Sequence, residues 1–423
     1  MLRRIVTAGS KLVFNILYKA RRKSERACEI VFLSRRTDAP SYDYEQLGLE
    51  FERRGWRVTM HLKKVTGANM ISYVFHVLEE IKLLGRCKLA VIDRYDPVVS
   101  LLDFECEVAS DAETAAGGGS AGQGGVQHAS EPACGAGLDG SQGSRDATMR
   151  ELRNVEFPLE PVILQMWHAF GAFKKFGYQS IGTPEGHSAD FTRSYSIHRN
   201  YSWVMCSGVG VREQFAEAFS CPVDRVVALD RPEYDELTAL AARRSAKRRA
   251  EGERPFCVLM APTLRINDES AHPFRDLYRA RETFEDRLDV QVTWSFHPLE
   301  EGMPAPGNVS DALLECDCVV TDYSSIVYEA YLLGVPVVFY VPDIDEYRLS
   351  PGLNTDPVCT SPGLCAQTPQ ELVEMLRALS NNPEAYDSGA LASFVGGAFD
   401  VDDDRSAGSA ASRLADFLVA SCR

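Results

Sequence analysis

The chain of 423 residues lacks Cys-x-x-Cys pairs, an excess of positive charge, and any group of His, Asp and Glu at metal-ligand spacing. Without paired spacing, its twelve cysteines predict neither a zinc site nor a disulfide framework, and we expect reduced thiols in a cytosolic setting. The net charge of −15 argues against nucleic acid as a partner, because phosphate backbones bind basic surfaces. The sequence therefore predicts no metal ion and no cofactor.

The first 26 residues differ from this acidic background, because eight basic residues face a single acid, Glu25, for a net charge of +7. Apolar residues recur there at helical spacing: Leu2, Ile5, Val6, Val13, Ile16, Leu17 and Ala20. Most basic residues fall on the opposite face, which predicts a helix lying on an anionic membrane surface. The segment is too short and too charged to span a bilayer, and nothing after it resembles a signal-peptide cleavage site. The alternative is an ordinary amphipathic helix docked on the first domain.

Beyond this helix, strands alternate with helices, which predicts parallel βαβ units. The expected strands are 29–33, 56–62, 89–93, 162–166, 201–206, 225–229, 256–260, 290–296, 318–320 and 337–340, with helices at 42–54 and 70–84 in the first part. This order favours an α/β protein of two doubly wound sheets joined near Arg199. A ligand is expected in the crevice that faces the strand ends.

Composition divides the chain further. Residues 108–148 are rich in Gly, Ala and Ser and lack periodicity, so we expect a disordered surface insertion. The predicted units are a membrane-surface helix (1–26), an N-terminal Rossmann-like domain (27–199) and a C-terminal Rossmann-like domain (200–395). A final helix (396–423) is expected to pack back on the N-terminal domain.

Polar clusters follow four of the expected strands. They are Trp167-His168-Ala169-Phe170-Gly171, Ala261-Pro262-Thr263-Leu264-Arg265, Ser295-Phe296-His297-Pro298 and Thr321-Asp322-Tyr323-Ser324-Ser325. A histidine directly after a strand can transfer a proton near neutral pH or donate to a phosphate oxygen. Ser324 or Ser325 opens a helix whose N-terminus favours anions, although either serine could merely cap that helix. Two histidines at equivalent places, with Arg265 and Ser324, favour a functional cleft. The other histidines are interpreted as surface or packing residues: His61, His76, His128, His187, His198 and His272.

These clusters carry a resemblance to a known family. "QMWHAFGAFKKFGYQSIG" resembles the Trp-His stretch of the teichoic acid CDP-glycerol glycerophosphotransferase family, some members of which act on ribitol phosphate. "VLMAPTLR", "FHP" and "VVTDYSSIVYEAYLLGVPVVFYVPDIDEYRLSPGL" are similar to its later motifs, in the same order. The resemblance covers Leu164 to about Leu353, whereas residues before Pro161 match only in general architecture.

The resemblance implies a GT-B-like fold, with two Rossmann-like domains facing a central cleft. It implies a peripheral enzyme at the cytoplasmic face of the cell membrane that makes teichoic-acid-like wall polymer. Such an enzyme moves glycerol phosphate or ribitol phosphate from CDP-glycerol or CDP-ribitol to a hydroxyl of a lipid-linked or polymeric polyol-phosphate acceptor, and CMP is released. The C-terminal domain would then bind the CDP-polyol, and the N-terminal domain would receive the acceptor.

Site residues follow from the matching motifs. The resemblance implies two catalytic histidines, a set of donor-binding residues and two lysines on the acceptor side: His168 and His297; Thr263, Arg265, Asp322, Ser324, Ser325 and Glu329; Lys174 and Lys175. We expect His168 to act as general base and His297 to donate to phosphate oxygens. The chain has Ala169-Phe170 where many members have Gly-Thr, which puts the glycerol assignment in question. Glu329, which the resemblance implies holds the donor ribose, replaces a frequent Asp, and "LDRPEYDEL" leaves the roles of Arg231 and Asp235 open.

Two other functions fit the same pattern. A GT-B glycosyltransferase or a nucleotide-sugar epimerase would share the fold and the cleft, although the paired histidines and the Asp-Tyr-Ser-Ser cluster speak against it. A non-catalytic, membrane-associated assembly factor descended from such an enzyme is a third possibility. Use of a CDP donor rather than a UDP donor separates the polyol-phosphate transferase from the glycosyltransferase or epimerase.

Overall fold

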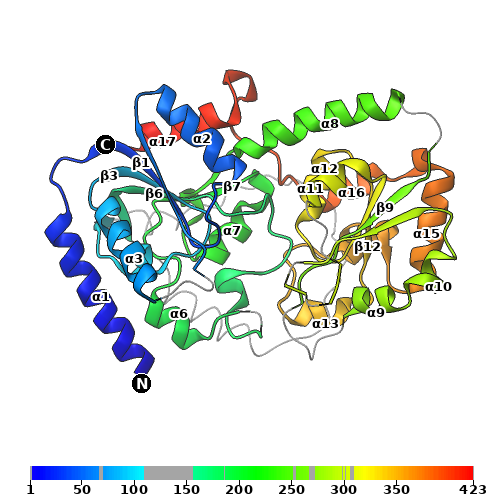
Figure 1. Ribbon diagram of the computed structural model, residues 1–423, viewed down its shortest axis with the longest axis horizontal. Coiled ribbons are helices and arrows are strands. Elements are labelled where there is room, and N and C mark those ends of the chain that lie inside the picture. Colours follow the sequence, from blue (N-terminus) through cyan, green and yellow to red (C-terminus); the bar gives the residue numbers. More distant parts are fainter. Residues whose placement is uncertain are drawn as a thin grey trace, which may run out of the picture.

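The computed structural model describes residues 2–65, 70–108, 156–184, 186–250, 254–265, 272–297, 299–300, 302–304 and 309–422. Two parallel sheets with packed helices form two lobes that lie side by side (Figure 1). The first sheet has the order β2-β1-β3-β6-β7-β8, and the second has the order β10-β9-β11-β12-β13. The expected α/β fold of two doubly wound domains is confirmed.

The strands of the first sheet are β1 (Ala27–Ser34), β2 (Arg57–Leu62), β3 (Cys87–Ile92), β6 (Val162–Gln165), β7 (Trp203–Cys206) and β8 (Val226–Ala228). Those of the second are β9 (Cys257–Met260), β10 (Gln291–Trp294), β11 (Cys318–Thr321), β12 (Val337–Tyr340) and β13 (Cys365–Ala366). An antiparallel pair, β4 (Glu105–Val108) and β5 (Glu156–Glu160), was not predicted. Residues 109–155, and with them nearly all of the expected insertion, lie outside the described residues.

The helices are α1 (Leu2–Arg21), α2 (Tyr42–Arg53), α3 (Met70–Leu84), α4 (Pro97–Leu101), α6 (Ala189–Tyr195), α7 (Arg212–Phe219), α8 (Pro232–Ala250), α9 (Pro273–Arg279), α10 (Arg281–Glu285), α11 (Val309–Glu315), α12 (Ile326–Leu332), α13 (Ile344–Leu349), α14 (Pro357–Thr360), α15 (Pro369–Asn381), α16 (Ser388–Val395) and α17 (Ala410–Ser421). Side-chain caps fix several of their starts. Ser41 accepts from a backbone N–H of α2, and Thr368 forms a capping box with Glu371 at α15. No helix among the described residues combines the length and apolar content needed to cross a bilayer.

Burial on both faces explains why the central strands read as continuous apolar runs. In β1, Ile30 and Phe32 pack into the cluster that contains α2 and α17, whereas Val31 and Leu33 pack into the cluster that contains α3 and α7. All four side chains are buried. Parallel strands covered by helices on both sides have this composition, because neither face meets water.

The expected boundary between residues 199 and 200 does not coincide with the boundary between the sheets. Strands β7 and β8, which were assigned to the C-terminal domain, pair with β6 and complete the first sheet. The chain crosses to the second lobe along α8 (Figure 1). Alternation of strands and helices predicts each βαβ unit, but it carries no information on which sheet a strand joins.

The C-terminal segment returns to the first lobe. Helix α17 lies against α2 and α8 (Figure 1). Ion pairs hold the crossing, because the Asp230 carboxylate accepts from Arg405 Nε at 2.8 Å and from Arg413 Nη2 at 2.6 Å. Asp230 and the Arg413 side chain are buried, so these bonds are shielded from solvent. The chain passes to the second lobe along α8 and returns through residues 396–409. Both passages lie beside Asp230, and we call this region around the start of α8 the hinge.

Helix α1 packs against α3 and α4. Its Tyr18 is buried and its hydroxyl accepts from Arg26 Nη2 at 2.8 Å, while the Asn15 amide donates to the Leu101 carbonyl at 3.0 Å. These polar contacts fix one face of α1 on the first lobe. The opposite side exposes apolar side chains, discussed below.

Candidate active site

A cavity of about 750 Å³ lies between the two sheets, at the carboxyl ends of their strands. First-lobe residues reach it from the loops after β1, β3 and β6: Arg36, Arg94, Tyr95, His168 and the segment 171–177. Second-lobe residues reach it from the ends of β9, β10 and β11: Thr263, Arg265, His297, Tyr323, Ser324 and Ser325. Both predicted histidines therefore line one cavity, as parallel strand ends that face each other require.

His168 is positioned by a strained turn at the end of β6. Trp167 adopts a φ of 59°, in the left-handed region that a bulky residue rarely occupies. The Gln165 side chain accepts the Trp167 N–H at 2.9 Å, and the Trp167 ring stacks on Phe176 with centroids 4.6 Å apart. The His168 ring centroid lies 4.2 Å from that of Trp167. Packing around Trp167 thus sets where the His168 ring points.

The surroundings of His168 keep its ring neutral. The ring faces the open cavity, but the cavity walls enclose it closely, and this desolvation lowers its pKa well below the usual value. The positive charges of Arg94, Arg231 and Arg36 lower the pKa further. The nearby backbone of Asp93 raises the pKa in turn. A neutral imidazole can accept a proton, as a general base must.

His297 has the complementary arrangement. The Leu299 N–H donates to His297 Nδ1 at 3.2 Å, so the neutral ring is assigned its proton on Nε2. Burial and the charge of Arg36 lower the pKa of His297, and Glu300 raises it. His297 can therefore donate from Nε2 to a phosphate oxygen.

Arg265 forms ion pairs with two carboxylates, so its charge is not available to a ligand alone. Its Nη2 lies 2.9 Å from Asp322 and its Nη1 2.8 Å from Asp343, and the guanidinium stacks over the Tyr347 ring at 4.7 Å. The second Asp322 oxygen accepts the Thr263 N–H at 2.7 Å. Asp322 is buried and does not line the cavity, so it positions Thr263 and Arg265.

The serines of the β11 turn face the cavity. Ser324 Oγ accepts the Ile326 N–H at a long 3.4 Å, and Ser325 is exposed and makes no side-chain cap bond to α12. The Tyr323 hydroxyl donates to Asp343 at 3.1 Å, and its ring stacks on Tyr347 at 3.7 Å. The turn is therefore anchored through Tyr323, and the Ser325 hydroxyl is not used by the helix it precedes.

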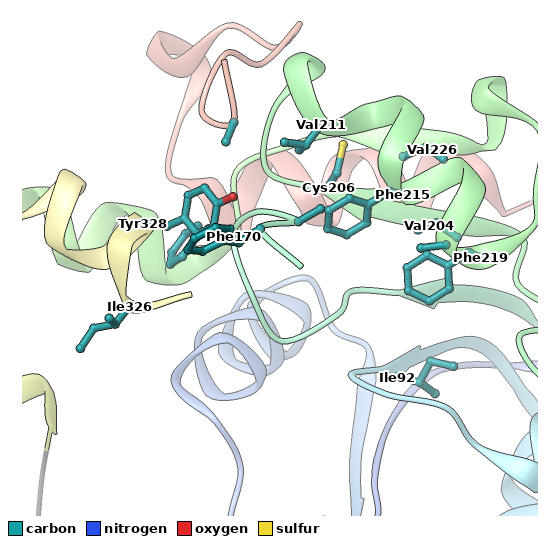
Figure 2. Packing of buried hydrophobic residues seen from close by; sticks show 14 of the residues in the cluster. Ile92, Phe170, Val204, Cys206, Val211, Phe215, Phe219, Val226, Ile326 and Tyr328 are labelled. Carbon is teal, nitrogen blue, oxygen red and sulfur yellow. The ribbon is translucent and has the colours of Figure 1, made fainter. Parts of the chain in front are cut away.

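The two lysines that were expected on the acceptor side lie on a segment that bridges the lobes. Lys174 and Lys175 line the cavity, and their backbone bonds to the second lobe: Asn354 donates to the Lys174 carbonyl at 3.1 Å, and the Lys175 N–H donates to Gly352 at 3.0 Å. Phe170 lies beside Tyr328 of α12 (Figure 2). A Cβ added to Gly171 would lie 2.1 Å from the Tyr328 ring, so only glycine fits there.

Glu329 differs from its expected role at the donor ribose. It does not line the cavity. Burial and the charge of Glu233 raise its pKa to about 8, and Arg231 lowers it. Arg231 itself donates from Nε to Asp43 at 2.9 Å, and Asp235 accepts the Ala410 N–H at 2.7 Å. In this arrangement, Glu329, Arg231 and Asp235 belong to the hinge around α8.

Sequence reasoning missed Arg36 and Arg94. Each stands two residues beyond the end of an apolar strand, β1 or β3, so the rule that found the histidines would also have found them. It also missed that His187 and His198 line the cavity, because neither follows a strand.

A second polar cluster lies at the edge of the first sheet, where no metal site was expected. Possible ligand atoms of His61, His76 and Glu80 lie within 4.8 Å of one another. The two imidazoles stack with centroids 3.9 Å apart, and Arg35 pairs with Glu80 at 2.5 Å and with Asp96. A guanidinium thus already neutralises the carboxylate, which weakens the case for a cation there. The sequence could not bring β2 and α3 together, because the two histidines are fifteen residues apart.

Comparison with known proteins gives a consistent picture. The family model for CDP-glycerol:poly(glycerophosphate) glycerophosphotransferase matches residues 146–418. The teichoic acid poly(ribitol-phosphate) polymerase of Bacillus spizizenii is 31% identical over 278 residues, which are 61% of this chain and 43% of that protein. The teichoic acid ribitol-phosphate primase of the same species is 30% identical over 211 residues, 44% of this chain and 53% of that protein.

The chain spans about half the length of these relatives. The teichoic acid glycerol-phosphate primase of Bacillus subtilis is 21% identical over 238 residues, 52% of this chain and 60% of that protein. Among solved structures, the wall teichoic acid polymerase TagF aligns with a TM-score of 0.64 at 16% identity, covering 100% of this chain and 96% of that chain. That similarity establishes a shared fold.

Proposed function

Because this chain belongs to the CDP-glycerol:poly(glycerophosphate) glycerophosphotransferase family, we propose that it transfers a polyol phosphate from a CDP-activated polyol to an acceptor hydroxyl. The observation that carries the proposal is the cavity itself. It brings together a neutral His168 from the first lobe, and His297, Ser324 and Ser325 from the second. The reaction contributes one unit of a teichoic-acid-like polymer.

The proposed reaction is an in-line substitution at phosphorus. The acceptor oxygen forms a bond to the phosphorus that carries the polyol, and the bond from this phosphorus to the bridging oxygen breaks, so CMP leaves. The proton of the attacking hydroxyl passes to His168, whose neutral ring is free to accept it. His297 donates from Nε2 to the phosphate oxygens as negative charge develops on them.

The donor is proposed to lie against the second lobe. The Ser324 and Ser325 hydroxyls and Thr263 can donate to its pyrophosphate. Arg265 adds positive charge, although Asp322 and Asp343 balance much of it. A solved TagF structure was soaked with CDPG, which supports a CDP-polyol donor in this fold. Higher identity to proteins named for ribitol phosphate than to those named for glycerol phosphate supports ribitol as the polyol.

The acceptor is proposed to be a lipid-linked or polymeric polyol phosphate that reaches the first lobe, near Lys174 and Lys175, from the membrane. Two neighbouring helices of the first lobe expose apolar side chains: Leu12, Val13 and Ile16 on α1, and Met70, Ile71, Val74 and Phe75 on α3. Exposed basic residues lie at the C-terminal end of α1 and directly after it: Lys19, Arg21, Arg22 and Lys23. Apolar surface rimmed by basic residues binds anionic lipid, so we place the enzyme peripherally on the cytoplasmic face.

Incubation with CDP-ribitol, CDP-glycerol and a UDP-sugar in turn tests the proposal. CMP release should need a CDP-polyol and an acceptor with a free polyol hydroxyl. Turnover of the UDP-sugar alone would instead indicate an epimerase or a glycosyltransferase. Binding of CDP-polyol without turnover, in the presence of acceptor, would indicate a non-catalytic assembly factor.

A further inference from the structure

We propose that Arg94 and Arg36 bind the phosphate that precedes the attacking hydroxyl in the acceptor, and so select acceptors that already carry a polyol phosphate unit. The inference rests on the proposed function, because it assumes that an acceptor hydroxyl reaches His168. It adds a binding site for a second phosphate, separate from the donor pyrophosphate.

The geometry of the cavity supports a site for an anion at these two residues. Both arginines line the same wall as His168, in the loops after β1 and β3. In the part of the chain that the structure describes, no ion pair involves either guanidinium. Arg94 Nε is buried and has no hydrogen-bond partner among the described residues. A buried donor without a partner is costly, so a ligand oxygen is the group that this position lacks.

Several other arginines that are buried or half-buried differ from this pair, because carboxylates form ion pairs with them. Arg35 pairs with Glu80 and Asp96, Arg231 with Asp43, and Arg265 with Asp322 and Asp343. The carboxylate nearest in sequence to Arg94 is Asp93, which accepts a hydrogen bond from Ser34 at 3.0 Å instead. Two cations thus share one wall with Asp93, whose charge acts on both, although no ion pair joins it to either among the described residues.

The electrostatics agree with this geometry. Burial and the like charge of Arg36 lower the pKa of Arg94 to about 10, against the opposite effect of Asp93, and the group stays protonated near neutral pH. Bringing an anion between two like charges would relieve their repulsion. A phosphodiester offers two oxygens to the fork of a guanidinium, the geometry that arginine binds best.

The position of the pair relative to His168 identifies which phosphate it binds. The His168 ring lies near the backbone of Asp93, the residue that directly precedes Arg94. Arg94 therefore lies on the first-lobe side of the base, whereas Ser324 and Ser325 lie on the second lobe. The charge of Arg36 lowers the pKa of both histidines, so this residue lies within electrostatic reach of each. A chain whose terminal hydroxyl meets His168 would extend its next phosphate along this wall.

Kinetics with two matched acceptors test the site. One is a lipid that carries a single glycerol phosphate unit, and the other is the same lipid with glycerol joined by an ether. Arg94→Ala and Arg36→Ala should each raise KM for the phosphate-bearing acceptor about 10- to 100-fold, the loss expected for one charge-assisted bond. The donor KM should change less than about twofold, and the loss with the ether acceptor should be much smaller than the loss with the phosphate-bearing acceptor. Arg94→Lys should restore little, since lysine lacks the fork. Arg243→Ala, an exposed position on α8, is the control.

Three outcomes would overturn the proposal. An equal rise in donor KM would mean that the arginines bind the donor pyrophosphate. Equal losses with both acceptors would mean that Arg94 only positions His168. Unchanged kinetics would remove both residues from the site. Binding of the phosphate-bearing lipid can also be measured by calorimetry, which needs no turnover. Weaker binding by Arg94→Ala than by wild type supports the site, and equal binding contradicts it. This result stands even if wild type releases no CMP and the proposed function fails.

Discussion

The two histidines of the cavity differ in the groups that set their protonation states. His168 and His297 were predictable, because each directly follows an apolar strand and such positions open into the cleft. The protonation state of His168 was not predictable, because it depends on groups distant in sequence. Burial and the charges of Arg94, Arg231 and Arg36 lower the pKa of His168. By contrast, a backbone N–H only two residues away sets the tautomer of His297.

Substitution of the two histidines should separate their roles. His168→Ala should lower kcat about 100- to 10,000-fold, the usual contribution of a positioned base, while CDP-polyol still binds. His297→Ala should weaken donor binding as well as turnover, because its partner oxygens are present before and during the reaction. Donor titration of both variants checks this. Lost donor binding in His168→Ala, with intact binding in His297→Ala, would reverse the assignment of the lobes.

His76 should make the first lobe sensitive to acid. Burial and the neighbouring charges of His61 and Arg35 lower its pKa to about 4. Because a histidine in the unfolded chain titrates near 6.5, protons favour the unfolded state below that pH, and stability falls until about pH 4. The loss due to His76 should reach about 2 kcal/mol at pH 5.

Denaturant unfolding at pH 7 and pH 5 measures this effect. His76→Phe keeps an aromatic ring against His61 and removes the titrating group, so its stability should fall less between the two pH values. An equal fall in wild type and variant would show that His76 is not a source of acid sensitivity.

At the scale of elements, local patterns predicted most boundaries well. The helix over 70–84 and the strand over 337–340 match the expected ranges, because the apolar periodicity there is long or continuous. Pairing could not be predicted in the same way. Strands β7 and β8 have the same local pattern as strands of the second sheet, and only their packing with β6 and α7 places them in the first.

The close approach of segment 170–176 to α12 predicts a strict need for glycine. Gly171→Ala would place a Cβ against the Tyr328 ring, which should cost about 1–3 kcal/mol and move the lysines of this segment. Gly363→Ala is the matched control, because no atom lies within 4 Å of its added Cβ. Thermal unfolding and kcat of both variants measure the difference. If Gly171→Ala were as stable and active as Gly363→Ala, the approach would be looser than described.

The exposed apolar side chains of α1 and α3 should mediate membrane binding. Replacing Leu12, Val13 and Ile16 by serine should reduce co-sedimentation with anionic vesicles at least about tenfold, since each buried side chain contributes on the order of 1 kcal/mol or more. Activity on a soluble acceptor should not change. Val223→Ser, exposed on the loop before β8, is the control. Undiminished vesicle binding of the triple variant would mean that α1 serves only as packing.

At the scale of the whole molecule, the site exists only because two lobes face each other. Sequence patterns predicted both sheets and the cleft, since alternating strands and helices have few other solutions. They could not predict the hinge, because its bonds join residues far apart: Asp43 to Arg231, and Asp230 to Arg405 and Arg413. They also assigned Glu329 to the ribose, whereas the fold turns it toward that hinge.

The account's central claim is polyol-phosphate transfer from a CDP donor through His168. The most direct measurement is single-turnover release of CMP from CDP-ribitol and CDP-glycerol, with a lipid that carries one polyol phosphate unit as acceptor. We expect the wild type to release CMP in one rapid phase, the acceptor to become longer by one unit, and the rate to fall by about 100-fold or more in His168→Ala. CMP release that His168→Ala leaves unchanged, or a wild type that consumes only UDP-sugars, would contradict it.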